Sequence, residues 1–447
     1  MTARQFGYRD ALTAIRSRGR FGIRLGLGRI GALLALLDHP ETVFRGALVA
    51  GTNGKGSVVA LTGSALRAAG YRIGEMPKPH LVTYRERIAV DGRPIEPEDF
   101  ARATARVLAL ADRVAPRYGD PTEFELLTAM AFRVFAEAGV DLAVVEVGLG
   151  GRLDATHAWD GGVATITNVE LDHVDRLGPT IEAIAREKAA IVMRGDRAVT
   201  GARGPALEII RRRSRRMGAP LTVVEPAPLL SLGRDGIEVE LPDMARVAVG
   251  LRGRHQAANV AVADATLDAL GTAGIASVSP AHRRAGYASA QWPGRLELLD
   301  VGGRPVLLDG AHNPAGAATL AEAMDDIRPY LARGRCTLVT AIMSDKDVDG
   351  VLRSLAASPH LAGARLIATS VGGERAMPPG DLAARWKAVT GGPAEAAAGP
   401  GAALEAALAP ARDGEASGPV VVAGSLYLVG AIRALLVHDP GLEPDPA

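Results

Sequence analysis

Short apolar and β-branched runs alternate with longer amphipathic stretches from residue 45 onward. The runs cover residues 47–50, 141–147, 163–168 and 197–200, and helical patterns lie between them, including one at 58–70 and one from Thr180. Alternation of this kind is typical of parallel strands joined by helices that cover both faces of a sheet. Ligands of such sheets bind at the carboxyl ends of the strands.

A second alternation begins near residue 297. Its apolar runs cover residues 305–309, 337–342, 366–369 and 420–423, with helical patterns after the first and the last. This pattern predicts another, smaller α/β domain. The segment 391–418 is rich in Ala, Gly and Pro, and we expect it to be an exposed helix with flexible flanks rather than a functional segment.

The sequence GTNGKGS at 51–57 connects the first apolar run to the first helical pattern. Between a strand and a helix, backbone N–H groups and the helix dipole form an anion site, and glycine lets a phosphate approach the main chain. Lys55 supplies a positive charge, and the Ser57 hydroxyl can reach Mg²⁺. Because Gly56 separates these two residues, we interpret the segment as a modified P-loop. The alternative is a turn that needs glycine only for its backbone conformation.

Charge and cysteine content narrow the function classes. Lys and Arg number 51 and Asp and Glu number 50 in 447 residues, so no global field favours nucleic acid or acidic membranes. We interpret the basic run 211–216 as a solvated helix end rather than a nucleic-acid patch. The single Cys336 excludes an intramolecular disulfide and a multi-cysteine metal site. No signal segment or membrane-length apolar run is present, so we expect a cytoplasmic protein.

Two polar side chains lie near the ends of predicted strands. Glu146 interrupts an apolar strand, and a buried carboxylate needs a neutralising partner. Mg²⁺ shared with phosphate is one such partner, and an ion pair with an arginine such as Arg152 is the alternative. His173 follows the next strand and is either a ligand at the same sheet edge as Ser57 and Glu146 or a structural histidine.

Other polar residues lie on helices. Thr122 and Glu125 form a T-x-x-E capping box ahead of an apolar helix that runs to about Gly139. Lys188 has apolar neighbours in AREKAAI. A lysine in such a position is either buried with a partner or a modification, or exposed at a helix turn.

Polar clusters recur in the second half, in WPGR at 292–295, LLDGAHNP at 307–314 and AGSLYLVG at 423–430. Asp309, His312 and Asn313 follow an apolar strand and precede a helix that starts with proline. This is the ligand side of a parallel sheet, although DGAHNP alone is also consistent with a cap and turn.

Read in order, these segments resemble the folylpolyglutamate synthase and dihydrofolate synthase family of the Mur ligase superfamily. The resemblance covers nearly the whole chain. Its motifs are FGIRLGL at 21–27, GTNGKGS at 51–57, PHL at 79–81, RERI at 85–88, EVGLGGRLDAT at 146–156, LDH at 171–173, EKAAI at 187–191, HQAAN at 255–259, PGR at 293–295, LDGAHNP at 308–314, DKD at 345–347 and GSLYL at 424–428. Such a series is far more specific than any single motif.

The resemblance implies an α/β fold with a P-loop parallel-sheet ATP-binding domain followed by a smaller Rossmann-like α/β domain. The first would be the Mur-ligase-type central domain at 1–296, and the second the C-terminal glutamate-ligase domain at 297–447. The implied reaction is ATP-dependent amide formation, in which a carboxylate is phosphorylated and the α-amine of glutamate attacks the acyl phosphate. The implied ligands are ATP, two Mg²⁺ ions, L-glutamate, and dihydropteroate or a folate. We expect a monomer that serves both dihydrofolate and polyglutamate synthesis.

The same resemblance implies roles for individual residues. The positions that match ATP contacts are Gly54, Lys55, Gly56, Ser57, Asn259, Arg295 and Asp309. The implied metal ligands are Ser57, Glu146 and His173. Lys188 matches a carbamylated lysine (N6-carboxylysine) that helps to bind the second metal, and His312 is the other implied catalytic residue. The implied substrate-binding positions are Ile23, Arg24, Leu25, Thr122, Glu123, Phe124, Glu125, Leu153, Asp154 and Ala155, with Ser425 and Tyr427 on the glutamate side. We also expect Lys78 and His80 to contact the substrate.

One departure from the family pattern concerns the metal set. Where the family usually reads T-S-P-H-L, with its serine near a metal, this chain has PKPHL and therefore Lys78. We hypothesise that one metal ion is bound more weakly here or is replaced by the ammonium group. The alternative is that Lys78 points to solvent. Smaller departures at Gly28 and His157 lie near the pterin positions and bear on substrate preference.

Three other functions are consistent with parts of the sequence. A superfamily relative with another carboxylate acceptor would not require the FGIRLGL and TEFE segments. A P-loop ATPase without ligase activity would have no use for the PGR and DGAHN segments. A catalytically silent ATP-binding regulator is suggested only by Lys78.

Overall fold

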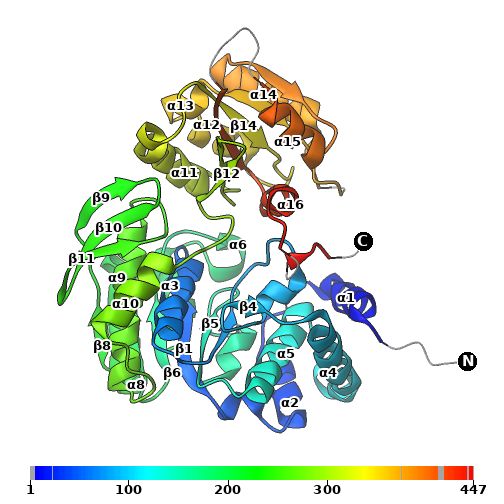
Figure 1. The fold of residues 1–447 in the computed structure, drawn as a ribbon. Coiled ribbons are helices and arrows are strands. Elements are labelled where there is room, and N and C mark those ends of the chain that lie inside the picture. Colours follow the sequence, from blue (N-terminus) through cyan, green and yellow to red (C-terminus); the bar gives the residue numbers. More distant parts are fainter. Residues whose placement is uncertain (1–5, 23, 374, 411–416, 440–441, 446–447) are drawn as a thin grey trace, which may run out of the picture.

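The computed structural model describes residues 6–22, 24–373, 375–410, 417–439 and 442–445. Two lobes lie one above the other in Figure 1: the N-terminal lobe contains strands β1 to β11, and the C-terminal lobe contains β12 to β17. No helix in the described part of the chain is both long enough and apolar enough to cross a membrane.

An eight-stranded sheet forms the centre of the N-terminal lobe. Its order is β4 (Arg93–Pro94), β3 (Ala89–Val90), β2 (Ile73–Met76), β5 (Leu142–Glu146), β1 (Arg45–Ala50), β6 (Gly162–Ile166), β7 (Arg197–Thr200) and β8 (Leu221–Val223). Strands β2, β5, β1, β6, β7 and β8 are parallel, whereas β3 and β4 extend the sheet as an antiparallel hairpin. The parallel sheet predicted from the apolar runs is confirmed.

Helices cover both faces of this sheet, so both faces are buried. Successive side chains of a strand point to opposite faces, and each strand therefore contributes to two cores. Leu48 and Ala50 of β1 belong to one core, and Ala47 and Val49 belong to the other. The first core lies under α1 (Tyr8–Ser17), α2 (Gly28–Leu36), α4 (Pro97–Tyr118), α5 (Glu123–Ala138), α7 (Ile181–Ala189) and α8 (Gly204–Met217). The second lies under α3 (Lys55–Ala68), α9 (Gln256–Thr272) and α10 (Pro280–Ser289).

A small antiparallel sheet that the sequence analysis did not predict covers part of the second core. It has the order β11 (Met244–Val249), β10 (Gly236–Leu241) and β9 (Leu229–Gly233), and it lies at the left edge of the N-terminal lobe in Figure 1. In β10 the buried side chains of Ile237, Val239 and Leu241 alternate with more exposed glutamates. This period of two is the signal that identifies such a strand.

The C-terminal lobe has a six-stranded sheet. Its order is β12 (Glu297–Val301), β13 (Arg304–Leu308), β17 (Ser417–Ala423), β14 (Arg335–Thr340), β15 (Arg365–Ala368) and β16 (Ala394–Ala396). All neighbouring pairs except β12 and β13 are parallel. The helices are α11 (Pro314–Ile327), α12 (Val348–Leu355), α13 (Pro359–Ala362), α14 (Pro379–Thr390), α15 (Pro400–Leu408) and α16 (Leu426–Leu436). The second α/β unit is therefore also confirmed.

Two local expectations need correction. The helix after the P-loop begins at Lys55, three residues before the predicted start, so Lys55 and Ser57 both lie in its first turn. The segment 391–418 contains strand β16 as well as α15, and α15 buries Ala403, Leu404 and Ala407. It is therefore not an exposed helix, since one face packs on the sheet. Residues 411–416 of this segment lie outside the described residues.

Candidate active site

The glycines of the P-loop are required by close packing as well as by backbone conformation. Gly54 has φ +79°, and a Cβ atom at this position would lie 2.2 Å from Asn259 Oδ1. A Cβ atom on Gly56 would lie 2.4 Å from Cζ2 of Trp292. Asn259 of α9 and Trp292 therefore lie directly against the loop, and Trp292 gives Gly56 a packing reason apart from phosphate binding.

Two lysines converge on the first residue of this loop. Lys55 Nζ donates to the carbonyl oxygens of Gly51 and Thr52, both at 3.1 Å, and Lys188 Nζ donates to that of Gly51 at 2.8 Å. The Lys188 side chain is buried, so the exposed alternative is wrong. Burial, reinforced by the Lys55 charge, lowers the pKa of Lys188 to about 7.

The three implied metal ligands follow neighbouring strands. Strand order β5-β1-β6 places Glu146 at the end of β5, Ser57 in the helix after β1, and His173 in the turn after β6. Glu146 and Ser57 are buried, whereas 57% of the His173 side chain is exposed. The hard oxygen donors of Ser57 and Glu146 suit Mg²⁺, which usually takes one or two protein oxygens together with phosphate and water. Across the described residues, no three or more His, Cys, Asp and Glu side chains form a complete metal cluster.

The alternative in which Glu146 forms an ion pair with Arg152 is wrong. Arg152 instead forms an ion pair with Glu187, with Nε 2.9 Å from Oε1. One oxygen of Glu146 accepts the backbone N–H of Lys78 at 3.0 Å. Burial raises the pKa of the Glu146 carboxyl group, and the charges of Lys55 and Lys78 oppose this rise. The two lysine charges thus favour the ionised form of the carboxylate, which is the form that binds a metal ion.

The Lys78 side chain is half-buried and does not point to solvent. Its Nζ donates to the carbonyl oxygen of Glu146 at 2.5 Å and lies 4.0 Å from the centroid of the Phe124 ring. Burial lowers the pKa of Lys78 to about 8, although Asp154 and Glu146 favour the charged form. The solvent alternative is therefore wrong, and the ammonium group is directed toward Phe124.

The capping box at the start of α5 is confirmed. One Glu125 oxygen accepts from the N–H and hydroxyl groups of Thr122 at 2.8 and 2.9 Å. The same carboxylate accepts from Nε of Arg29 at 2.9 and 3.0 Å, and Arg29 Nη2 donates to the carbonyl oxygen of Arg24 at 2.6 Å. The segment 24–29 is therefore tied to the start of α5. Glu123, in the first turn of α5, is half-buried.

The turn at 153–155 joins the same region. Asp154 is buried and accepts from Thr156 through one oxygen and from the N–H of Leu149 through the other. The Leu153 carbonyl accepts from the Gly26 N–H at 3.3 Å. Ala155 is buried, whereas Arg24 and Leu25 are exposed; Ile23 lies outside the described residues. The three segments implied for the acceptor are thus brought together.

His80 lies in a cluster of its own on the loop after Lys78. Arg87 Nε donates to His80 Nδ1 at 2.7 Å, and the imidazole ring is 4.2 Å from that of Tyr84. Burial and the Arg87 charge lower the pKa of His80 to about 3. The imidazole is therefore neutral at physiological pH, with Nδ1 as the acceptor.

The C-terminal lobe presents a second group of polar side chains. Asp309 accepts from the backbone N–H groups of Leu296 and Ala311, both at 2.9 Å. Burial raises the pKa of the Asp309 carboxyl group, and the charge of Arg295 opposes the rise. The ring nitrogen Nδ1 of His312 is 2.8 Å from the Gly310 carbonyl oxygen, so Nδ1 carries the proton. Burial lowers the pKa of His312.

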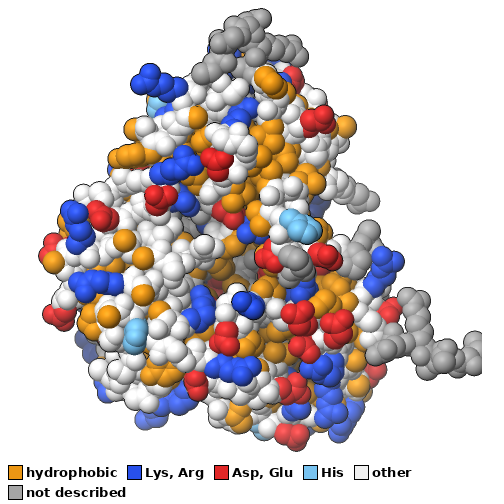
Figure 2. Space-filling model, in the orientation of Figure 1, with side chains coloured by type: hydrophobic (Ala, Val, Ile, Leu, Met, Phe, Trp, Pro, Cys, Tyr) orange, Lys and Arg blue, Asp and Glu red, His pale blue; other side chains and the backbone are white. Residues whose placement is uncertain are grey.

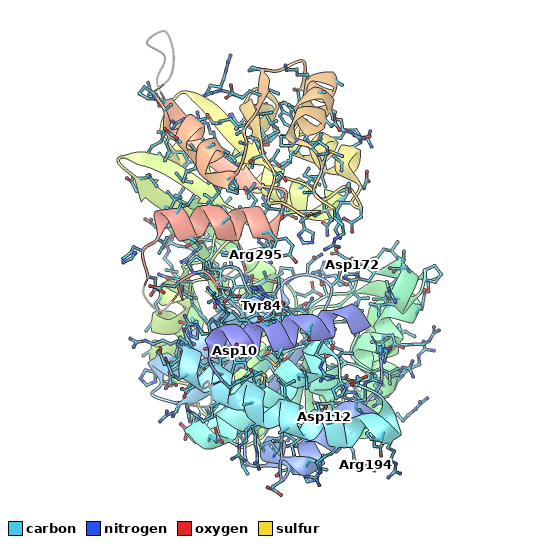
Figure 3. The ribbon with its side chains drawn as sticks, turned by 90° about the vertical axis from the view of Figure 1, so that its right-hand side faces the viewer. Asp10, Tyr84, Asp112, Asp172, Arg194 and Arg295 are labelled. Carbon is cyan, nitrogen blue, oxygen red and sulfur yellow. The ribbon has the colours of Figure 1, made fainter. Side chains whose placement is uncertain are left out.

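The two groups face each other across the lobes. The charge of Arg295 opposes the rise that burial causes in the pKa of Glu146, and the charge of Asp172 favours protonated His312. Figure 3 places Arg295 and Asp172 in the region between the lobes. The ends of β5 and β6 therefore lie near the DGAHN segment.

Other predicted residues have structural contacts. Ser425 is buried and caps α16 by accepting from the Tyr427 N–H at 3.2 Å, whereas 60% of Tyr427 is exposed. Asn313 caps α11 by accepting from the Gly316 N–H at 2.8 Å, so the cap alternative is correct for this residue.

The sequence analysis missed two residues of the site. Gln256 Nε2 lies 3.4 Å from the Ser57 hydroxyl, and its Oε1 accepts from Asn259 at 2.8 Å. Trp292 lies against Gly56. Both occur within or beside quoted motifs, HQAAN and WPGR, so their proximity to residues with assigned roles was the available signal.

A pocket at the junction of the lobes borders this site through Trp292. It is lined by residues that include Glu75, Pro77, Leu81, Trp292 and Arg433, and by none of the predicted site residues.

Charged side chains of both signs are mixed over the face in Figure 2, without a continuous basic band. The basic run 211–216 forms the end of α8, as predicted, and Arg213 donates there to the carbonyl oxygens of Val192 and Ala190.

Two family descriptions match most of the chain. Residues 49–267 match the Mur ligase middle domain, and residues 298–436 match the C-terminal domain of dihydrofolate synthetase. A dihydrofolate synthase/folylpolyglutamate synthase of Bacillus subtilis is 38% identical over 370 residues, which cover 79% of this chain and 84% of that protein. A protein of the same description from Mycobacterium tuberculosis is 35% identical over 456 residues, with 93% and 90% covered.

Solved structures agree with the sequence relatives over nearly the full length. The folylpolyglutamate synthase of Mycobacterium tuberculosis, complexed with ADP and AMPPCP, has a TM-score of 0.83 at 32% identity and covers 96% of this chain and 100% of its own. FolC of Escherichia coli, in complex with DHPP and ADP, has a TM-score of 0.77 at 29% identity, with 95% and 97% covered. A bifunctional enzyme of Yersinia pestis, complexed with AMPPNP and a Mn ion, has a TM-score of 0.79 at 28% identity, with 98% and 99% covered.

Proposed function

The chain belongs to the folylpolyglutamate synthase/dihydrofolate synthase family of ligases, and on this basis we propose how its two lobes carry out the reaction. The N-terminal lobe, residues 1–296, binds ATP and the acceptor, and the C-terminal lobe, residues 297–447, binds glutamate. The reaction joins L-glutamate to dihydropteroate, to the γ-carboxyl group of a tetrahydrofolate, or to both. It takes place in the cytoplasm, with one chain as the active unit.

One observation supports this proposal: His312 of the C-terminal lobe lies near Asp172, which follows β6 of the N-terminal lobe, so that the two charges interact. Arg295, next to the lobe boundary, connects the two sides: its charge favours the ionised forms of Glu146 and Asp309, and Gly310 donates its N–H to the Gly294 carbonyl at 2.8 Å. A phosphoryl transfer followed by amide formation needs cations around the transferred group and a second substrate brought to it by the opposite lobe. An isolated P-loop ATPase needs only the first of these.

In the first step the γ-phosphoryl group of ATP is transferred to an oxygen of the acceptor carboxylate, and ADP leaves. The P-loop from Gly54 to Ser57 holds the phosphates through its N–H groups and Lys55. Asn259, Arg295 and Asp309 hold the rest of the nucleotide. Ser57 and Glu146, with His173 after reorientation of its exposed side chain, would hold Mg²⁺, which neutralises phosphate charge when bound.

In the second step the amine nitrogen of glutamate attacks the acyl carbon, and inorganic phosphate leaves. Attack releases a proton from the amine. His312 is suited to accept it, because the Gly310 carbonyl fixes the proton on Nδ1 and leaves Nε2 as the basic nitrogen. Ser425 and Tyr427 lie at the start of α16, where they can contact glutamate.

The acceptor lies along the segments at 24–25, 122–125 and 153–155. Hydrogen bonds from Arg29 to Glu125 and from Gly26 to Leu153 fix these segments relative to one another. Phe124 provides an aromatic surface there, and Asp154 provides a carboxylate, a combination that suits an aromatic heterocycle with N–H donors. This acceptor region favours a pterin over another carboxylate substrate.

The test is a ligation assay with purified protein, ATP, labelled glutamate, and either dihydropteroate or tetrahydrofolate. We expect incorporation of label with equimolar ADP, and incorporation with only one acceptor would make the enzyme monofunctional. Lys55→Ala should lower the rate by about 100-fold or more. Lys387→Ala, on the exposed face of α14, is the matched control. ADP release that glutamate and both acceptors fail to stimulate would favour an ATPase without ligase activity.

A further inference from the structure

Lys78 lies between the nucleotide side and the acceptor side of the site. Its backbone N–H donates to the Glu146 carboxylate, whereas its side chain extends past that carboxylate to the Glu146 carbonyl oxygen and the Phe124 ring. A Cβ atom on neighbouring Gly148 would lie 2.9 Å from both Phe124 Cζ and Asp154 Oδ2. The ammonium charge is therefore placed beside Phe124 and Asp154, in the acceptor region.

The Lys78 ammonium group has N–H donors that are available to a ligand. An ammonium group has three N–H donors, and in the described part of the chain only the Glu146 carbonyl oxygen accepts one of them. Asp154 has one oxygen that accepts from both groups of Thr156 and another, Oδ2, that accepts only from Leu149. A carboxylate offers about four lone-pair sites, so Oδ2 has one left. A donor and an acceptor thus remain side by side.

We propose, on the basis of the function proposed above, that Lys78 donates a charge-assisted hydrogen bond to the 4-oxo group of the acceptor's pteridine ring. The 2-amino-4-oxo edge of such a ring presents an oxygen acceptor beside N–H donors, which complements Lys78 beside Asp154 Oδ2. The ammonium also covers one face of the Phe124 ring, so a ligand that approaches from that face meets a hydrogen-bond donor. Lys78 is thus a specificity residue for the acceptor.

A 4-amino ring provides the discriminating ligand, because its amino group places a donor against the ammonium. The experiment measures the dissociation constants of pteroate and 4-amino-4-deoxypteroate by calorimetry, with ADP and Mg²⁺ present, for wild type, Lys78→Met, Lys78→Arg and the control Lys387→Met. We expect wild type to prefer the 4-oxo ligand by about 10- to 100-fold, the range of a hydrogen bond to a charged donor. Lys78→Met should reduce the preference to near one, Lys78→Arg should retain part of it, and Lys387→Met should retain all of it.

The outcomes separate this inference from the proposed function. If wild type binds both ligands and Lys78→Met keeps the wild-type preference, the inference is overturned even when both affinities fall equally. If Lys78→Met instead gains a Mn²⁺ site, measured by electron paramagnetic resonance with AMPPNP, and keeps the preference, the ammonium replaces a metal ion and the inference is also overturned. If wild type binds neither ligand and ligates glutamate to neither acceptor, the proposed function fails first. Thermal melts of Lys78→Met and Lys78→Arg show whether each variant is folded.

Discussion

Two lysines share one carbonyl oxygen at the end of β1, and this contact changes the chemistry available to Lys188. Both ammonium groups lie within hydrogen-bond distance of the Gly51 oxygen. Burial removes the water that would stabilise a charged Lys188, and the like charge of Lys55 adds to this effect. The pKa of Lys188 is therefore about 7 rather than the ordinary value of 10.5.

We predict that Lys188 is carbamylated in a pH-dependent manner. Only the neutral amine reacts with carbon dioxide, and a pKa of about 7 raises its neutral fraction from about one tenth at pH 6 to about nine tenths at pH 8. With ¹³C-labelled bicarbonate, a carbamate NMR signal should grow over this interval. Lys188→Arg should lack the signal, whereas Lys387→Arg should keep it. An equally strong signal at pH 6 and pH 8 would contradict the prediction.

His312 gives a second prediction at this scale. His312→Gln should lower kcat by about 10²- to 10⁴-fold and leave the KM for ATP nearly unchanged, because it removes a base and not a phosphate contact. Burial lowers the pKa of His312, so wild type should lose kcat only as the pH falls below the ordinary histidine value of about 6.5. His438→Gln, at an exposed histidine, serves as the control. A loss of kcat that begins above pH 7 would assign the titrating group elsewhere.

At the scale of secondary structure, the start of α5 organises the acceptor region. Glu125 combines the capping box with an ion pair to Arg29, and only 3% of its side chain and 14% of the Arg29 side chain are exposed. Arg29 in turn holds the Arg24 carbonyl oxygen. One carboxylate therefore fixes both the helix and the segment that precedes α2.

We predict that Glu125→Gln raises the KM for the acceptor several-fold and leaves the KM for ATP unchanged. It should also lower the free energy of unfolding by about 1 to 3 kcal/mol, because a buried arginine loses its charged partner. Glu137→Gln breaks the exposed Arg133–Glu137 pair near the other end of α5 and should change stability by less than about 0.5 kcal/mol. Urea unfolding and steady-state kinetics on both variants provide the measurements, and an equal rise in both KM values would refute a specific effect on the acceptor region.

Elements with a strong period were predictable from the sequence. The buried parallel strands occur in the sequence as continuous apolar runs, and the capping box at Thr122 indicates the start of a helix. The antiparallel sheet β9 to β11 was missed because its strands are partly exposed and less apolar, even though β10 alternates. Trp292 and Gln256 were missed because their role depends on contacts with residues more than 190 positions away in sequence, which no local pattern encodes.

At the scale of the whole molecule, the lobes are joined by more than the linking chain. Arg254 of the N-terminal lobe donates to Asp326 of α11, with Nε 3.0 Å from Oδ2. At the link between the lobes, the Glu297 carboxylate accepts from the Gly294 N–H and also from Arg433 of α16 in its own lobe. The chain after α16 adds a further contact, since it lies beside α1 in Figure 1. Substrates bound by different lobes must meet, so contacts of this kind influence the reaction.

Asp445 makes the contact between the chain after α16 and the N-terminal lobe. Its side chain is only 6% exposed. It accepts from the Tyr8 hydroxyl at 2.6 Å, from the Thr83 hydroxyl at 2.7 Å and from Arg16 at 3.0 Å. A carboxylate with three such donors is held by charge-assisted hydrogen bonds, which are stronger than neutral ones. Thr83 also caps the short helix Tyr84–Arg87, whose Arg87 holds His80. The tail therefore connects the C-terminal lobe to the loop that carries Lys78 and His80.

We predict that Asp445→Asn loosens the arrangement of the lobes. Loss of the negative charge should lower the free energy of unfolding by about 1 to 3 kcal/mol. It should also raise the acceptor KM, because the hydrogen bond that holds Thr83 of the loop at 78–87 becomes weaker. Small-angle scattering of the nucleotide-free protein should give a larger radius of gyration for the variant than for wild type. Glu443→Gln changes an exposed carboxylate two residues earlier in the same tail and should match wild type in all three measurements. If Asp445→Asn also matches wild type, the tail contact has no part in holding the lobes, and the Arg254–Asp326 pair becomes the main contact between them.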